Sequence, residues 1–343
     1  MSKFGRLKRW LLAPEPPGVG VEFRPGEIVI ARFDEGGRGF MDLCLRAPIP
    51  PGVVDFSMLR PNLVEPEALR AFLKQLFDEA GVKGTRIGLT LPDMLARISL
   101  VDLPGAPRPM RSSAEVVDML RFRLKKSLPF DAGEARLSYQ STPTASSASA
   151  STLSFLTGIM HESVAAQYEG LFADLGFHVG AIETSSLSLL KLWEPVVLES
   201  LSPEQDYFFL NLEETYFTVS LVRNRSRLVL VRTVGHRSPL LDTEALDFRH
   251  RPSYEAEGLL RELLPTFIYY QEKLEGSSLA RVYYRSLRPD LGDLAGVLEE
   301  QFQVPAEPFD LSRAVKVGSH LTVEEPMASV AGAASGVARG KAA

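Results

Sequence analysis

The sequence predicts an α/β protein built from two related halves, and three observations lead to this prediction. First, the segments 19–33 and 208–234 share one pattern, in which a β-rich strand, a short polar or Gly/Pro turn and another β-rich strand follow each other. Second, strand-length apolar runs alternate along the chain with segments whose apolar residues recur at helical spacing. Third, a chain of 343 residues is long enough for two domains of ordinary size, each with a substantial core.

The elements of the first half follow from capping and turn signals. After the hairpin 19–33, a helix is expected at 66–80, because Pro66 suits a first helical turn, one face carries an apolar stripe and Gly81 suits the C-terminal cap. The same kinds of signal predict strands at 86–91, 96–103, 136–140, 153–160 and 178–182, and helices at 112–128, 162–175 and 185–198.

The second half opens with the hairpin 208–234, and helix and strand signals then follow in turn. Apolar residues at helical spacing predict a long helix at 253–274, which is followed by a short strand at 279–284. A helix at 293–302 and a strand-like piece at 304–309 complete this half.

Two segments have compositions that do not suit a packed core. Residues 141–152 are almost entirely Ser, Thr, Ala and Pro, with neither a charge nor a large apolar side chain, so burial cannot offset their ordering entropy. We expect a flexible loop there. Residues 327–343 are rich in Ala, Gly, Ser and Val, and we expect them to form a disordered tail.

Residues 1–17 form a basic leader that ends in a proline-rich stretch. Its cations, Lys3, Arg6, Lys8 and Arg9, alternate with apolar residues at helical spacing, which is typical of a short amphipathic helix in contact with an anionic membrane surface. A disordered basic leader would have the same composition. The sequence leaves these two alternatives open.

Composition and motif content exclude several classes of function. A formal net charge of −5 and a pI near 5.7 give no electrostatic basis for binding nucleic acid. The histidines stand at no metal-ligand spacing, so no metal site is expected. No nucleophile elbow or Gly-Lys-Ser/Thr phosphate loop occurs, so no catalytic residue is assigned. The absence of a membrane-spanning apolar run and of a signal peptide predicts a cytoplasmic protein.

A set of short motifs, in a shared order and spacing, resembles the type IV pilus assembly protein PilM family across residues 18–310. The motifs are Gly20-Val21-Glu22, Thr90-Leu91-Pro92, Ile98 to Pro104, Lys126 to Phe130, Arg136 to Tyr139 and Arg232 to Gly235. The resemblance implies an actin-like fold, which is a duplicated RNase H-like architecture, with an inserted α/β subdomain. It places the opening part of the first subdomain at 18–84, the insertion at 85–182 and the remainder of the core at 183–310.

In that family the protein is cytoplasmic and binds the N-terminal cytosolic tail of a bitopic membrane partner, PilN. It thereby couples the inner-membrane platform and the cytosolic motor ATPases to the rest of the machine. For this chain the resemblance implies a non-catalytic scaffold, peripheral to the inner membrane, of a type IV pilus or related secretion machine. We expect the partner peptide in a cleft between the hairpin region 18–33 and the insertion near 85–130.

Members of the family commonly bind ATP through an Asp and a Gly in each hairpin, and this sequence departs from that pattern. In the first hairpin, Gly20 is followed by Glu22 where the Asp is expected and by Arg24 where a glycine is expected. In the second, Asn211 replaces the Asp, which removes a carboxylate for Mg²⁺, and Glu213 brings negative charge to the phosphate position. These five positions predict a degenerate nucleotide site with weak or lost ATP binding.

The turn that should contact the adenosine also departs from the family pattern. A Gly-Gly pair is expected after the strand 279–284, and the sequence there reads Tyr284-Arg285-Ser286-Leu287, whose side chains would crowd the base. No cofactor is therefore expected, with ATP and Mg²⁺ disfavoured. In this respect the chain is similar to the cytoplasmic domain of GspL, although it lacks the transmembrane helix attached to that domain.

Two alternative functions on the same fold stay open. One is a working actin-like ATPase or small-molecule kinase, which the altered hairpins disfavour. The other is a filament-forming, membrane-associated protein of the cell-division type, which would need an amphipathic C-terminus, and the tail 327–343 has no apolar stripe.

Overall fold

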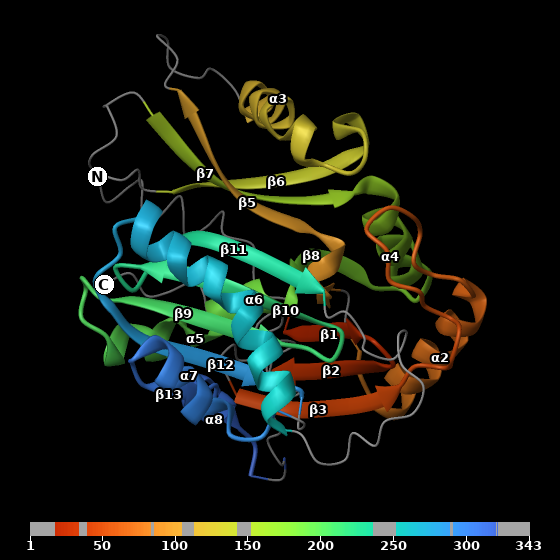
Figure 1. Ribbon diagram of the computed structural model, residues 1–343. Coiled ribbons are helices and arrows are strands. Elements are labelled where there is room, and N and C mark those ends of the chain that lie inside the picture. Colours follow the sequence, from red (N-terminus) through yellow and green to blue (C-terminus); the bar gives the residue numbers. More distant parts are fainter. Residues whose placement is uncertain are drawn as a thin grey trace, which may run out of the picture.

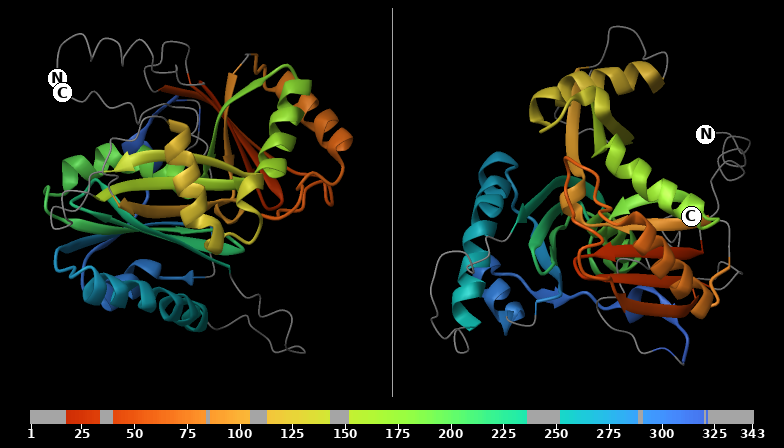
Figure 2. Two further views of the ribbon diagram at one scale, coloured as in Figure 1. Left: turned by 90° about the horizontal axis from the view of Figure 1, so that it is seen from above. Right: turned by 90° about the vertical axis from the view of Figure 1, so that its right-hand side faces the viewer.

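The computed structural model contains three β-sheets with helices packed against them (Figure 1). Two larger sheets form the two halves of the molecule, and a small sheet with one helix stands at one end (Figure 2). The structure describes residues 18–33, 40–83, 86–104, 113–142, 152–235, 252–288, 291–319 and 321.

The first half is built on a six-stranded sheet with the order β14-β3-β2-β1-β4-β8. Strands β1, β2 and β3 form an antiparallel meander, and β4 and β8 continue the sheet in parallel to β1. The last strand in the sequence returns to pair with β3, with Lys316 opposite Phe40. The bounds are β1 Val19–Arg24, β2 Glu27–Phe33, β3 Phe40–Pro48, β4 Arg86–Leu91, β8 His178–Thr184 and β14 Lys316–Val317.

The second half repeats this topology in a five-stranded sheet with the order β11-β10-β9-β12-β13. Again a three-stranded antiparallel meander is followed by two strands that run parallel to its first strand. The predicted duplicated architecture is thereby confirmed. The bounds are β9 Asp206–Leu212, β10 Tyr216–Arg223, β11 Arg227–Gly235, β12 Leu279–Ser286 and β13 Ala306–Pro308.

The small sheet is inserted between β4 and β8 and has the antiparallel order β5-β7-β6. Its strands are β5 Arg97–Pro104, β6 Ala135–Thr142 and β7 Thr152–His161. One face packs against α3, Ser113–Leu124, through a cluster that includes Leu120 and Phe155. The separate sheet therefore occupies a shorter stretch than the predicted insertion 85–182, because β4 and β8 belong to the large sheet.

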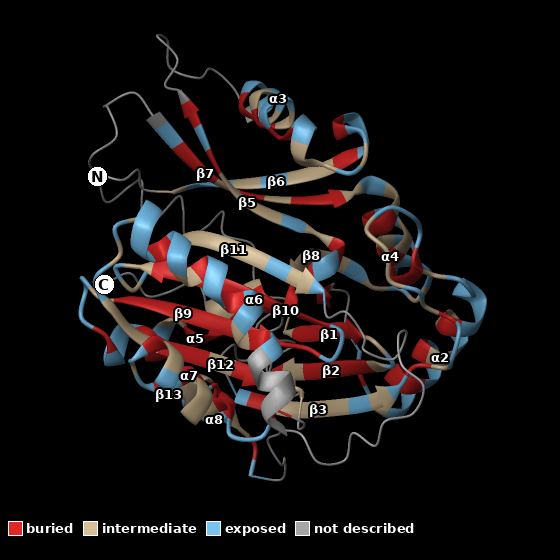
Figure 3. Ribbon diagram, in the orientation of Figure 1, coloured by how far each residue is buried: buried red, intermediate tan, exposed pale blue. Residues whose placement is uncertain are grey.

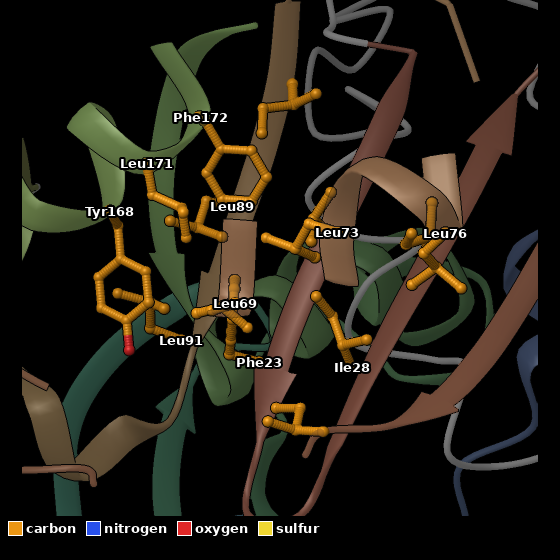
Figure 4. Packing of buried hydrophobic residues seen from close by; sticks show 14 of the residues in the cluster. Phe23, Ile28, Leu69, Leu73, Leu76, Leu89, Leu91, Tyr168, Leu171 and Phe172 are labelled. Atoms are coloured by element: carbon orange, nitrogen blue, oxygen red, sulfur yellow. The ribbon is translucent and has the colours of Figure 1, made fainter. Parts of the chain in front are cut away.

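Helices α2, Pro66–Glu79, and α4, Glu162–Asp174, cover one face of the first sheet (Figure 4). In α2 the apolar stripe predicted from the sequence is buried, and Gly81 adopts a φ of 59°, the left-handed conformation that glycine tolerates at a helix end. In α4, Tyr168 meets Phe23 of β1 edge-to-face, with ring centroids 5.1 Å apart.

Helix α5, Ser185–Ser200, lies between the two large sheets and joins their cores. Trp193 is fully buried there, with its ring 5.6 Å from that of Tyr283 and 4.6 Å from that of Phe309. The other face of the second sheet is covered by α6, Pro252–Lys273, and α7, Leu294–Phe302. The cluster around α5, which includes Val29 of the first sheet and Phe209 of the second, thus joins the two halves.

Most elements expected from the sequence are confirmed, and four differences stand out. Strand β3 was not expected, although its residues alternate from Met41 to Arg46 at the period of a half-buried strand. The short elements α8, Leu311–Ala314, and β14 were also not expected, because such brief segments carry little pattern. The predicted hairpin 208–234 is the three-stranded meander β9-β10-β11.

Some expectations concern residues outside the described part of the chain. These are the basic leader 1–17, the tail 327–343 and most of the predicted loop 141–152. The ends of that loop are described, since β6 extends to Thr142 and β7 begins at Thr152. None of the helices within the described ranges is long and apolar enough to cross a membrane.

Candidate functional sites

The first hairpin, β1–β2, carries a buried ion pair near its turn. Glu22 and Arg24 are 1% and 3% exposed, and the Arg24 Nη2 lies 2.6 Å from the Glu22 Oε2. The Arg24 Nη1 donates to the Glu27 Oε1 at 3.1 Å. Burial alone would lower the pKa of Arg24, but Glu22 and Glu213 outweigh it and raise that pKa. Gly20 lies within β1 opposite Ala31, away from the turn.

The second hairpin, β9–β10, contributes Asn211 and Glu213 to the same region. The Arg285 Nη1, from β12, donates to the Glu213 Oε1 at 2.5 Å and to the Asn211 Oδ1 at 2.8 Å, and Arg285 is fully buried. The Ser185 Oγ donates to the Glu213 Oε1 at 3.2 Å. Burial would raise the pKa of Glu213, but Arg285 and Arg24 hold that pKa below its ordinary value.

A third buried carboxyl, Asp93, joins the two halves beside these hairpins. It accepts hydrogen bonds from the Ser186 N–H at 2.9 Å and the Ser186 Oγ at 2.5 Å, and its own N–H donates to the Tyr216 hydroxyl at 3.2 Å. Burial raises the pKa of Asp93, and nearby Glu213 raises it further. The hydrogen bonds from Ser186 and Thr218 lower that pKa but do not outweigh burial. Burial, followed by Glu213 and Asp93, raises the pKa of Tyr216 well above its usual value.

The structure therefore brings four of the five predicted hairpin positions into one buried cluster, which we call the hairpin ion network. It consists of Glu22, Arg24, Asn211, Glu213 and Arg285. Two glutamates face two arginines, so the formal charges cancel within the network. Among the metal-ligating side chains of the described residues, no group of three or more gathers in one place.

Sequence reasoning missed the role of Arg285. It was expected to crowd an adenosine, but its side chain turns inward because β12 runs parallel to β9 with Arg285 opposite Asn211. An arginine directly after the apolar and aromatic run Val282-Tyr283-Tyr284 was the signal that could have revealed it. Asp93 and Ser186 were also missed, since only the folded chain brings the ends of β4 and β8 to β9.

The neighbours of Arg285 line a cleft between the two halves. This cleft has a volume of about 440 Å³, and Tyr284, Ser286 and Leu287 form one side while Glu27 and Arg46 form the other. The Arg46 Nη2 lies 2.8 Å from the Glu27 Oε2, so these two opposite charges are paired at the cleft wall. Glu27, which also accepts a hydrogen bond from Arg24, thus connects the cleft wall to the buried hairpin ion network.

A larger groove of about 890 Å³ runs between the small sheet and the body of the protein, and we call it the inter-sheet groove. Its walls come from β6 and β7 on one side, and from β8, α5 and the β10–β11 turn on the other. Both β6 and β8 stand at the end of their sheets. Apolar side chains line much of it, among them Ile98, Leu156, Met160, Ile182 and Leu190.

The charged side chains of the inter-sheet groove are mostly paired. Arg136 contacts Glu169, and the Lys191 Nζ lies 2.6 Å from the Glu183 carboxylate. Arg227 differs, because its Nε is buried without a hydrogen-bond partner in the described part of the chain. A buried donor of this kind favours a ligand that brings an acceptor oxygen.

The inter-sheet groove does not coincide with the peptide cleft predicted from the sequence, which stays a prediction. Among the described residues that line the inter-sheet groove, none belongs to the hairpin region 18–33, and only Ala96 and Ile98 belong to 85–130. The reason is that β4 separates the first hairpin from β8 within the large sheet, so the groove faces β8 instead. The predicted membrane contacts Lys3, Arg6, Lys8 and Arg9 lie outside the described residues.

Comparisons with known proteins agree with this architecture. No protein-family model matches the chain, and no curated protein matches it in sequence. Among solved structures, the PilM-PilN type IV pilus biogenesis complex matches with a TM-score of 0.75 at 18% identity, over 95% of this chain and 99% of that chain. The cytoplasmic domain of EpsL, an inner-membrane component of the type II secretion system of Vibrio cholerae, gives a TM-score of 0.47 at 10% identity, over 92% and 93%.

The chain is thus an α/β protein of the actin-like fold, with a small α/β unit inserted into its first half. Within that fold it is similar to the protein of the PilM-PilN complex along nearly its whole length. The resemblance seen in the sequence motifs is confirmed at the level of the fold.

Proposed function

We propose that this chain is a non-catalytic cytoplasmic scaffold, peripheral to the inner membrane, of a type IV pilus or related secretion platform. Its inter-sheet groove binds the N-terminal cytosolic peptide of a bitopic, PilN-like membrane protein. The observation that carries the proposal is the groove itself, which is large, largely apolar and bounded by two strands that end their sheets.

The groove suits an extended peptide better than a compact small molecule. Its volume of about 890 Å³ is near the upper end of the roughly 300–1,000 Å³ of small-molecule sites. A peptide can add a strand at β6 or β8, where the backbone has a neighbour on one side only, and can place alternate side chains against Ile98 and Leu156. The buried Nε of Arg227 would donate to a carbonyl or carboxylate of the same peptide.

The hairpin ion network supports the non-catalytic part of the proposal. In it, Arg24 and Arg285, the cations that could bind phosphate, are already engaged by Glu22 and Glu213. An ATP molecule would have to break two buried pairs and would bring further negative charge beside two carboxylates. The site is therefore better suited to holding the two halves together than to hydrolysis.

The test is fluorescence anisotropy with synthetic N-terminal peptides of bitopic, PilN-like proteins from the same organism, and with scrambled peptides of the same composition. Because ordering a flexible tail costs several kcal/mol, we expect a micromolar Kd, which membrane tethering strengthens in the cell. Equal binding of authentic and scrambled peptides would contradict the proposal.

Two groove variants and one control sharpen this experiment. Leu156→Glu places a charge among apolar contacts and should weaken binding at least tenfold, since burying a leucine contributes roughly 1.5–3 kcal/mol. Arg227→Gln should weaken it about tenfold through loss of a charge-assisted hydrogen bond. Arg232→Gln is the control, because Arg232 is on the same strand but donates to the carbonyl oxygen of Glu262 on α6. An equal loss in all three variants would count against the groove.

A further inference from the structure

Helix α3 and the 3₁₀ turn that follows it, η2 (Lys125–Ser127), carry an exposed aromatic side chain among cations. Phe122 is 83% exposed, the largest exposed fraction among the large apolar side chains in the described part of the chain. Four basic residues, Arg121, Arg123, Lys125 and Lys126, stand within four positions of it. We call these five residues the α3 patch.

The cations of the α3 patch are available for an external partner. Arg123, Lys125 and Lys126 are exposed and form no ion pair with any residue that the structure describes. Arg121 donates to the carbonyl oxygen of Ala135 at 3.2 Å, a bond that leaves its positive charge uncompensated. The patch thus carries four positive charges on a chain whose formal net charge is −5.

Phe122 is not needed for the packing of α3. The opposite side of the helix buries Val116, Leu120 and Leu124 against the small sheet, and the exposed side faces away from it (Figure 3). The helix lies at the outer end of the molecule, on the far side of the small sheet from the large sheets (Figure 2). The α3 patch therefore faces outward from the molecule.

We propose that the α3 patch binds an anionic phospholipid surface. Its cations would lie among the lipid headgroups, and Phe122 would enter the interfacial region where aromatic rings partition favourably. Charge complementarity favours a lipid surface as the partner. The cations around Phe122 can each lie close to a negatively charged headgroup, while the one projecting apolar side chain enters the interface. An acidic protein partner would also neutralise the positive charges of the patch, but it would need an apolar pocket to bury Phe122.

This attachment leaves the inter-sheet groove accessible to a tail that starts at the membrane. The α3 patch and the groove lie on opposite faces of the small sheet, since Phe155 packs toward α3 whereas its strand neighbour Leu156 lines the groove. One helix layer and one sheet layer together measure about 20 Å, which about six or seven extended residues span. Lipid binding itself does not depend on the proposed peptide.

The test is co-sedimentation of the full chain, at low salt, with vesicles of phosphatidylcholine containing about a third phosphatidylglycerol. Each cation near such a surface contributes about a fivefold factor in partitioning, so K125Q/K126Q should bind roughly 20-fold more weakly than the parent chain. K83Q/K273Q is the charge-matched control, because Lys83 and Lys273 are exposed elsewhere on the molecule. We expect this control to bind as the parent does, and both double variants to bind the groove peptide unchanged.

A second measurement follows the aromatic ring directly. F122W in a W10F background should show fluorescence quenching by brominated lipids, while Trp193, which is fully buried, stays silent. An equal loss in the two double variants, or no quenching of F122W, would overturn the proposal. Absence of vesicle binding by the parent chain would also overturn it. If the parent chain then bound an acidic protein instead, the patch would be assigned to a protein partner.

Discussion

Replacing Arg285 with methionine tests the hairpin ion network most sharply. The substitution keeps an unbranched apolar stem but removes a fully buried guanidinium, whose Nη1 contacts Glu213 at 2.5 Å and Asn211 at 2.8 Å. Breaking a buried pair by removing one partner costs roughly 3–5 kcal/mol, because the other charge is left buried. Arg24 still acts on Glu213, and the Nε and Nη2 of Arg285 have no partner among the described residues. We therefore expect a loss of about 3 kcal/mol.

The assay is urea unfolding at pH 7, followed by the fluorescence of the buried Trp193. The double variant with Glu213→Gln and Arg285→Met should recover part of the loss, because both charges are then removed together. Arg60→Met is the matched control, since Arg60 pairs with Asp55 at an exposed site and should cost less than about 1 kcal/mol.

The same variant should change how stability depends on pH. The pKa of Glu213 is lowered in the folded protein, so this group contributes stability that is present at neutral pH and lost as pH falls below about 4.3 through the folded pKa. In Arg285→Met this contribution is largely absent, so the gap to the parent should be constant near neutral pH and should narrow as the pH falls below about 4.3. A cost below 1 kcal/mol, or a gap that is independent of pH, would refute the reasoning.

Three further predictions concern nucleotide binding, membrane binding and the shortening of the loop between β6 and β7. Calorimetric titration with Mg-ATP should give weak or no binding and no hydrolysis, because the hairpin ion network is already neutralised, and a micromolar Kd would contradict this. Removal of residues 1–13 should weaken sedimentation with anionic liposomes. The four cations of this segment contribute about 1 kcal/mol each to the free energy of membrane binding, a few kcal/mol in all. Equal binding of the two forms would count against this prediction. Replacing 143–150 by a four-residue turn should leave Tm unchanged or slightly raised, since loop closure changes by only about 1 kcal/mol, whereas a drop of many degrees would show a packed segment.

The fold was predictable because its pattern repeats along the chain. The hairpin 19–33 and the meander beginning near 208 carry the apolar and β-branched runs of buried strands, and both open a sheet of the same topology. The helix with Pro66 at its start and Gly81 beyond its end shows how local capping chemistry sets element bounds. Strand β3 carried a comparable pattern from Met41 to Arg46 and could have been recognised from it.

The sites were less predictable, because they depend on which strands become neighbours. The hairpin positions Glu22 and Glu213 were identified, but Arg285, which neutralises Glu213, is selected by the parallel register of β12 on β9. The inter-sheet groove differs from the cleft predicted between 18–33 and 85–130 for a similar reason. Strand β8 pairs with β4, although the whole small sheet lies between these two strands in the sequence. No local pattern specifies that long-range pairing.

The central claim is that the inter-sheet groove, rather than the hairpin region, binds the partner. Hydrogen–deuterium exchange of the full chain, with and without the N-terminal peptide of the bitopic protein, measures this directly. The peptide should slow amide exchange in β6 and β8, the two sheet-end strands that border the groove, and leave the β1–β2 and β9–β10 hairpins unchanged. Protection confined to those hairpins, or no protection at saturating peptide, would contradict the claim.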